Sequence, residues 1–187
     1  LTNGPIWVNG KIGGALSFDG INDFVLVSNW QGISGNAPRS ICCWVKTTVG
    51  GSICSWGEDD NREKWVFKLQ SENGKIGTLR TEVNDGFILG QTALNDGTWH
   101  FVCSILPENS SNISNVIHYF DGARDGVSSA DHKGITTKLN NPFRIGRRIN
   151  ISNSSKDRFF NGLIDDVRIY DRALSAAEVQ ALYNLGQ

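Results

Sequence analysis

The stretch "FNGLIDDVRIYDRALSAAEVQALYNLG", residues 160–186, joins a strand pattern to a helix pattern, and this combination decides the fold. Its first half contains "LIDDVRIY", a short run of apolar residues interrupted by charged ones, of the kind that forms a β-strand. Its second half places Ser175 as an N-cap with Glu178 three residues later, which is the spacing of a capping box. Gly186 is expected to end the helix in the left-handed conformation. Apolar residues at helical spacing predict one packed face: Val179, Leu182 and Tyr183.

No other segment of the sequence has a helix pattern. Short apolar or alternating runs recur instead between turn pairs such as "NG", "DG" and "GG", and glycine contributes 21 of the 187 residues. Many short strands with regular turn signals are typical of a sandwich or jelly roll. In "KWVFKLQ", residues 64–70, apolar and polar side chains largely alternate, which predicts a strand with one buried face.

Length and charge narrow the possibilities further. A chain of 187 residues is long enough for one well-buried domain and too short to favour two. The net charge of −1 gives no electrostatic reason to expect nucleic acid or an anionic membrane as a partner. No apolar run approaches the roughly 20 residues of a membrane helix, so membrane insertion is not expected. Met is absent even at position 1, so we expect a domain excised from a larger multidomain protein.

Four segments together resemble the laminin-G-like jelly rolls of the concanavalin A-like lectin/glucanase superfamily. They are residues 160–186, "ALSFDGINDFVLV" (15–27), "LNDGTWHFVCSIL" (94–106) and "HYFDGARDG" (118–126), and they follow the order of that family. The resemblance implies an all-β, two-sheet antiparallel jelly-roll sandwich with one short C-terminal helix, spanning residues 1–187 as a single domain. It also implies carbohydrate binding by a non-catalytic module.

The acidic run "GEDDNRE" has a spacing used by some retaining glycosidases on β jelly rolls, with Glu58, Asp60 and Glu63 in the order E-x-D-x-x-E. In such enzymes the carboxylates project from one strand, so the residues between them point into the core. Here the intervening residues are polar or charged, and burying them would be costly. The run also lacks strand-forming residues. We therefore interpret it as a solvated loop and assign no catalytic residue.

A structural calcium site is implied by the same resemblance. In resembling jelly rolls, calcium often joins the loop between the first two strands to the last strand. Asp19, Asn22 and Asp165 stand at these positions and offer the hard oxygen ligands that calcium prefers. The alternative is that Asp19 and Asn22 shape a turn while Asp165 pairs with a nearby arginine.

Sugar recognition couples an aromatic platform with hydrogen-bonding side chains, because pyranose rings have apolar faces and polar rims. Trp30 and Trp56 sit at predicted strand edges and are the candidate platforms, or alternatively packed anchors of their loops. Alternation predicts polar residues on the outer face of a curved sheet, as a positively biased groove: Lys68, Gln70, Arg80, His118 and Arg144. Arginine pairs bidentately with carboxylate or sulfate, so an acidic polysaccharide is the expected ligand. An ordinary solvated sheet face is the alternative.

The four cysteines do not show a zinc-binding C-x-x-C spacing. Buried free thiols are the favoured interpretation, because cysteine is among the most buried residue types. A disulfide between Cys43 and Cys54 across a hairpin at "VGGS" is the alternative.

These observations predict a monomeric carbohydrate-binding module, extracellular or at the cell surface, that targets a neighbouring catalytic module to its polysaccharide. Its expected partner is a polysaccharide or oligosaccharide, and nucleic acid is not expected. An adhesion domain that contacts protein is the first alternative, and a small glycosidase or polysaccharide lyase is the second.

Overall fold

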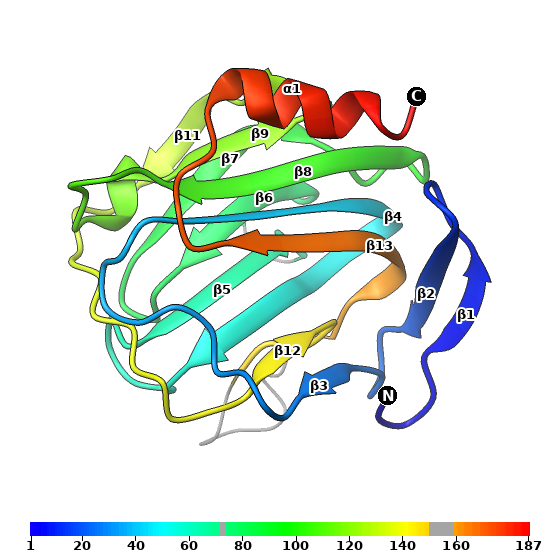
Figure 1. Ribbon diagram of the computed structural model, residues 1–187, viewed down its shortest axis with the longest axis horizontal. Helices are drawn as coiled ribbons and strands as arrows, with labels where there is room; N and C mark the ends of the chain where they lie inside the picture. The colour runs from blue at the N-terminus through cyan, green and yellow to red at the C-terminus, as the bar shows by residue number, and fades with distance from the viewer. Residues whose placement is uncertain (72–73, 150–158) are drawn as a thin grey trace.

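A computed structural model describes residues 1–71, 74–149 and 159–187, and it shows two antiparallel sheets packed face to face with one helix (Figure 1). Sheet I has the order β10 (Ala123–Arg124), β9 (Ile117–Phe120), β8 (Trp99–Leu106), β4 (Arg39–Gly57), β13 (Asn161–Tyr170), β2 (Gly14–Asp19) and β1 (Ile6–Asn9). Sheet II has the order β3 (Val25–Val27), β12 (Phe143–Ile145), β4, β5 (Lys64–Leu69), β6 (Thr78–Glu82), β7 (Phe87–Ala93) and β11 (Val127–Ala130). The predicted all-β sandwich is confirmed.

Strand β4 belongs to both sheets. Residues 39–46 pair with β8 in sheet I, and residues 51–57 pair with β5 in sheet II. The change of sheet occurs at Gly50 and Gly51, whose φ angles of +111° and +131° are rarely available to other residues. A side chain at Gly51 would also come within 2.4 Å of the Phe159 carbonyl oxygen. The "VGGS" segment is therefore a bend within one strand, and the hairpin predicted there is wrong.

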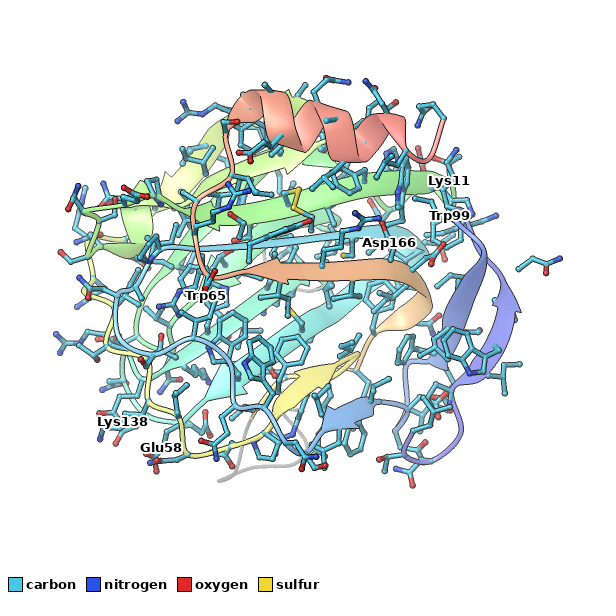
Figure 2. The ribbon with its side chains drawn as sticks, in the orientation of Figure 1. Lys11, Glu58, Trp65, Trp99, Lys138 and Asp166 are labelled. Carbon is cyan, nitrogen blue, oxygen red and sulfur yellow. A yellow bond between two sulfur atoms is a disulfide. The ribbon has the colours of Figure 1, made fainter. Side chains whose placement is uncertain are left out.

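The main hydrophobic core fills the space between the sheets. The apolar residues of the alternating run in β5 point into it, as predicted: Trp65, Phe67 and Leu69. Trp65 lies inside the sandwich (Figure 2), where its ring stacks on that of Trp56 at 5.9 Å between centroids. Sequence alternation therefore predicts the inner face of this strand correctly.

A second apolar cluster lies on the outer face of sheet I, beneath α1 (Ala176–Asn184), which runs over β8 and β9 in Figure 1. The capping box is confirmed, because the Glu178 amide donates to Ser175 Oγ and the Ser175 amide donates to Glu178 Oε2. Gly186 does not adopt the predicted left-handed conformation. It instead allows close approach to Trp44, since a Cβ there would lie 2.4 Å from the indole.

The same cluster contains a disulfide between Cys42 on β4 and Cys103 on β8, two residues that stand directly opposite each other. The preference for free thiols is thus wrong for this pair and correct for Cys43 and Cys54, which are buried and unbonded. Burial raises the pKa of both free thiols. The disulfide ties the two central strands of sheet I together.

The helices within the described ranges are α1 and the single turn η1 (Ile113–Asn115). Neither has the length and the apolar character needed to cross a membrane.

Candidate functional site

The outer face of sheet II carries a polar cavity of about 330 Å³. Ligand pockets in proteins typically measure ~300–1,000 Å³, so this cavity has the size of a small binding site. Strands β5, β6 and β7 and the segment after β12 supply its lining: Lys68, Gln70, Arg80, Glu82, Asn84, Phe87 and Arg148. Lys68 stands opposite Arg80 in the register, and residues directly opposite in antiparallel strands point to the same face.

Glu82 is the centre of this cavity, and only 2% of its surface is exposed. Its Oε2 lies 3.2 Å from Lys68 Nζ and 2.9 Å from Arg80 Nε, and its Oε1 lies 2.8 Å from Arg148 Nη2. Burial alone would raise the pKa of Glu82, but these three cations together with Lys64 outweigh burial and lower the pKa to about 2. Glu82 is therefore a fixed negative charge.

Among the residues that the structure describes, positive charge exceeds negative charge around this carboxylate, since three cations pair with one anion. Burial lowers the pKa of Lys68, and the charge of Glu82 opposes this shift. The neighbouring Lys64 is also buried, and its Nζ is held 2.7 Å from Asp59 Oδ1. An anionic ligand would balance the remaining positive charge of the cavity.

Arg80 is positioned for such a ligand. Its Nε donates to Glu82, and its guanidinium lies 3.9 Å from the centre of the Phe87 ring. Its two terminal nitrogens make no hydrogen bond to any residue that the structure describes. Because the guanidinium is fixed through Nε and its flat face, these two donors are prearranged for a bidentate contact with a carboxylate or a sulfate.

The structure brings together three of the residues predicted from sequence, namely Lys68, Gln70 and Arg80. Arg144 lies on the same sheet, but the register Arg144–Ser55–Val66–Glu82 places it three strands away from the centre of the cavity. Arg148 was not predicted, although the paired arginines of "GRRI" directly follow the strand run "PFRIG".

The predicted position of His118 in the groove is wrong, because its side chain lies between the sheets. Its Nε2 is 2.8 Å from Thr81 Oγ1, and complete burial lowers the pKa of His118 to about 3. The alternation in β9 was predicted correctly, but the faces were exchanged. Tyr119 points outward into the cluster beneath α1, so the polar His118 points inward.

The two tryptophans predicted as platforms for a sugar ring differ in their exposure to solvent. Trp56 is fully buried in the core, and its Nε1 donates to the Ile33 carbonyl oxygen at 3.0 Å, so it presents no face to a ligand. This corrects its predicted role and matches the alternative of a packed anchor. Trp30 lies in the loop between β3 and β4 and remains 36% exposed. It does not line the cavity on sheet II.

The three predicted calcium ligands do not converge. Asp165 Oδ2 accepts hydrogen bonds from the amides of Lys11 and Ile12, at the turn between β1 and β2. Asp19 lies at the far end of β2, opposite Asn161. Asp165 lies four positions after Asn161 on β13, a span of about 13 Å. Asp19 Oδ1 accepts the amides of Ile21 and Asn22 and so shapes a turn. These residues do not fit one ion as a set.

The three acidic residues of the E-x-D-x-x-E pattern (the acidic trio) lie in the loop between β4 and β5, as predicted: Glu58, Asp60 and Glu63. Glu63 pairs with Lys138 at 2.7 Å, and Glu58 accepts a hydrogen bond from Asn140. Figure 2 shows Glu58 and Lys138 at the periphery of the molecule. The carboxylates of this loop bind neighbouring loop residues and do not line the cavity on sheet II.

Comparison with known proteins identifies the family. A sequence profile described as the Concanavalin A-like lectin/glucanases superfamily, of laminin G type, matches residues 19–180. The chain therefore belongs to this superfamily, as the sequence motifs predicted. No curated protein matches the chain in sequence.

Several solved structures share the fold. Domain 4 of AbnA, a GH43 extracellular arabinanase from Geobacillus stearothermophilus in complex with arabinotriose, superposes with a TM-score of 0.71 at 22% identity, covering 97% of this chain and 82% of that domain. The CBM40 of the Ruminococcus gnavus IT-sialidase, bound to α2,3-sialyllactose, gives 0.66 at 13% identity, covering 90% and 95%. A putative carbohydrate-binding protein from Bacteroides ovatus also gives 0.66 at 13% identity, covering 89% and 45%. At these identities the likeness shows the fold alone.

Proposed function

We propose that this member of the concanavalin A-like superfamily is a non-catalytic carbohydrate-binding module for an acidic polysaccharide, which it binds on the outer face of sheet II. The observation that carries the proposal is the arrangement around Glu82. Three cations surround one buried carboxylate, and within this cavity of ligand size the two terminal nitrogens of Arg80 bind no residue of the described ranges.

The chemistry of the lining favours a uronate or a sulfated sugar. Arg80 offers two parallel donors, which match the two oxygens of a carboxylate or of a sulfate edge. Lys68 and Arg148 add charge that a neutral sugar would not use. The amide groups of Gln70 and Asn84 are suited to sugar hydroxyls, because an amide both donates and accepts.

The same residues support a non-catalytic role. A retaining glycosidase needs two carboxyl groups roughly 5–5.5 Å apart, and one of them must carry a proton. Among the described residues that line the cavity, one is a carboxylate, Glu82, and its pKa of about 2 keeps it ionised. The acidic trio belongs to a separate loop, where Glu63 is neutralised by Lys138.

The setting of the module is inferred from three further observations. A disulfide within sheet I is compatible with an oxidising, extracellular environment. Two proteins of the same fold are parts of an extracellular arabinanase and of a sialidase. We accordingly place the module outside the cell, next to a catalytic module of the same protein.

Affinity electrophoresis and calorimetry with polygalacturonate, alginate and heparin, set against neutral arabinan, test this proposal. The wild-type protein should bind at least one acidic polysaccharide, and binding should weaken as salt rises. Arg80→Ala should lower this affinity at least tenfold, and Arg80→Lys should lower it less. Arg124→Ala is the matched control, because Arg124 is exposed on β10 of sheet I. Absence of binding to every acidic polysaccharide, or an Arg80→Ala variant with unchanged affinity, would overturn the proposal.

A further inference from the structure

We infer that a second saccharide-binding site, for a neutral sugar, lies at the side of the sandwich between the β3–β4 loop and the end of β13. A cavity of about 450 Å³ occurs there, within the ~300–1,000 Å³ typical of ligand pockets. It is lined by apolar and polar groups together: Trp30, Ile33, Ser34, Leu139, Ile169 and Asp171. None of these residues belongs to the cavity on sheet II, so the inference does not depend on the proposed function.

Trp30 provides the aromatic surface. Trp30 is 36% exposed, and its ring is supported by Phe143, with 5.1 Å between the ring centroids. Its backbone is fixed on both sides, since its amide donates to the Val27 carbonyl and its carbonyl accepts the Phe143 amide. An indole held in this way offers a rigid apolar surface with a polar N–H, which suits the apolar face and polar rim of a sugar ring.

The loop that carries Trp30 is held from below by Arg39, which is fully buried. Its guanidinium donates to the carbonyl oxygens of Ile33, Ser34, Gly35 and Ala37 at 2.8–3.1 Å. Burial lowers the pKa of Arg39 to about 9, which shows how unfavourable the site is for charge. A buried cation that fixes four carbonyls of one irregular loop makes that loop rigid.

Trp56 fixes the same loop from the core side. Its Nε1 donates to the Ile33 carbonyl at 3.0 Å, and its ring lies directly under Gly32. Gly32 has a φ of +94°, and a Cβ there would lie 2.2 Å from the indole. Two buried side chains thus set the conformation of the cavity wall in advance, which lowers the entropy lost when a ligand binds.

Asp171 sets the charge of this cavity. It follows the last residue of β13, is exposed, and makes no hydrogen bond or ion pair with the parts of the chain that the structure describes. An ionised carboxylate accepts hydrogen bonds through both oxygens, as needed for neighbouring sugar hydroxyls. None of the described residues that line this cavity is a cation, in contrast to the cavity on sheet II, so the charge of Asp171 would disfavour an acidic sugar. The geometry therefore favours a neutral saccharide.

Titration with neutral oligosaccharides of arabinose, xylose, glucose and galactose, followed through the indole N–H resonances, tests this inference. At least one oligosaccharide should shift the Trp30 signal. Trp30→Ala should lower its affinity at least tenfold, whereas Trp7→Ala should leave it unchanged, because Trp7 is 69% exposed on β1 and outside the cavity.

Asp171→Asn is the second variant, because a surface substitution leaves the core intact. It should lower the same affinity severalfold without changing the midpoint of unfolding. Arg80→Ala should not affect neutral sugars, so failure of this site and failure of the acidic-polysaccharide site are distinguishable. Lack of binding to every neutral oligosaccharide, or equal affinities of the Trp30→Ala and Trp7→Ala variants, would refute the inference.

Discussion

The outer face of sheet I carries apolar side chains beneath α1, whereas the outer face of sheet II carries charged side chains. On sheet I, the outward side chains of β4 and β8 include Trp44 and Phe101, a disulfide joins the two strands, and α1 covers them (Figure 1). On sheet II, the outward side chains of β5 and β6 include Lys68, Arg80 and Glu82, and they line an open cavity. One face stabilises the fold, and the other is available to a ligand.

This difference supports the proposal that the outer face of sheet II binds the ligand. Apolar burial beneath α1 contributes directly to the free energy of unfolding. Buried ions add little net stability, because the loss of hydration offsets their attraction. Among the described residues, three cations contact Glu82, and this charge is consistent with the proposed binding of an acidic ligand. Substitutions on the two faces should therefore differ in their effects on the free energy of unfolding and on ligand affinity.

The largest expected effect on stability belongs to sheet I. Removing the disulfide through a Cys42→Ser and Cys103→Ser double variant should lower the free energy of unfolding by about 4 kcal/mol, because the bond closes a loop with a sequence separation of 61 residues. Urea unfolding measures this. Affinity for acidic polysaccharide should stay unchanged at a temperature where the variant is folded. A loss of stability below 1 kcal/mol, or a parallel loss of affinity, would contradict the claim that the outer face of sheet I stabilises the fold while that of sheet II binds the ligand.

A smaller loss is expected from Glu82→Gln on sheet II. The substitution leaves three cations without their central anion, at a cost on the order of 3 kcal/mol. The lowered pKa of Glu82 means that its contribution is complete above pH 4.5 and is lost as the pH falls towards 2. The variant should therefore lack the part of the stability loss in this window that comes from Glu82, while the part that comes from other groups remains. Glu108→Gln, at an exposed loop position, is the control.

His118, in the core between the two sheets, should make the protein lose stability at a higher pH than Glu82 does. The pKa of His118 is about 3 in the folded protein and 6.5 in its ordinary state. As the pH falls, the imidazole is therefore protonated in the unfolded chain before it is protonated in the folded one. Stability is complete above pH 6.5 and declines as the pH falls towards 3, by about 2 kcal/mol between pH 7 and pH 5. His118→Gln should flatten this part of the profile. His132→Gln, in an exposed loop, should retain it.

The smallest effect is expected from metal removal. Asp19 and Asp165 use their carboxylate oxygens on separate turns, so we expect a chelator to leave the midpoint of thermal unfolding unchanged. Calcium added after dialysis against chelator should also have no effect. An increase of several degrees on adding calcium would show that other oxygens form an ion site.

The sequence patterns predicted those features that depend on neighbours along the chain. Alternation located the inward residues of β5, and the Ser175–Glu178 spacing located the start of α1. Strand β7 was not predicted, because Gly90 interrupts its apolar run. This glycine is needed where the strand passes Asp125, since a Cβ would lie 2.2 Å from the carboxylate.

Features that depend on pairing across the sheets were not predictable from sequence. The inversion of His118 arises because α1 makes the outer face of sheet I apolar, and alternation alone does not say which face is covered. The Cys42–Cys103 bond depends on the register of β4 and β8. Arg148 reaches Glu82 only because the chain after β12 returns over sheet II, where the amide of Ile149 donates to Ser55 Oγ.

Backbone amide spectra recorded during titration with an acidic oligosaccharide, such as a galacturonate oligomer, test the central claim most directly. Binding at the Glu82 cavity should shift the resonances of β5, β6 and Arg148 and leave those beneath α1 unchanged. The contradicting result is a set of shifts confined to sheet I and α1, with the resonances of Lys68, Arg80 and Glu82 unaffected at saturation.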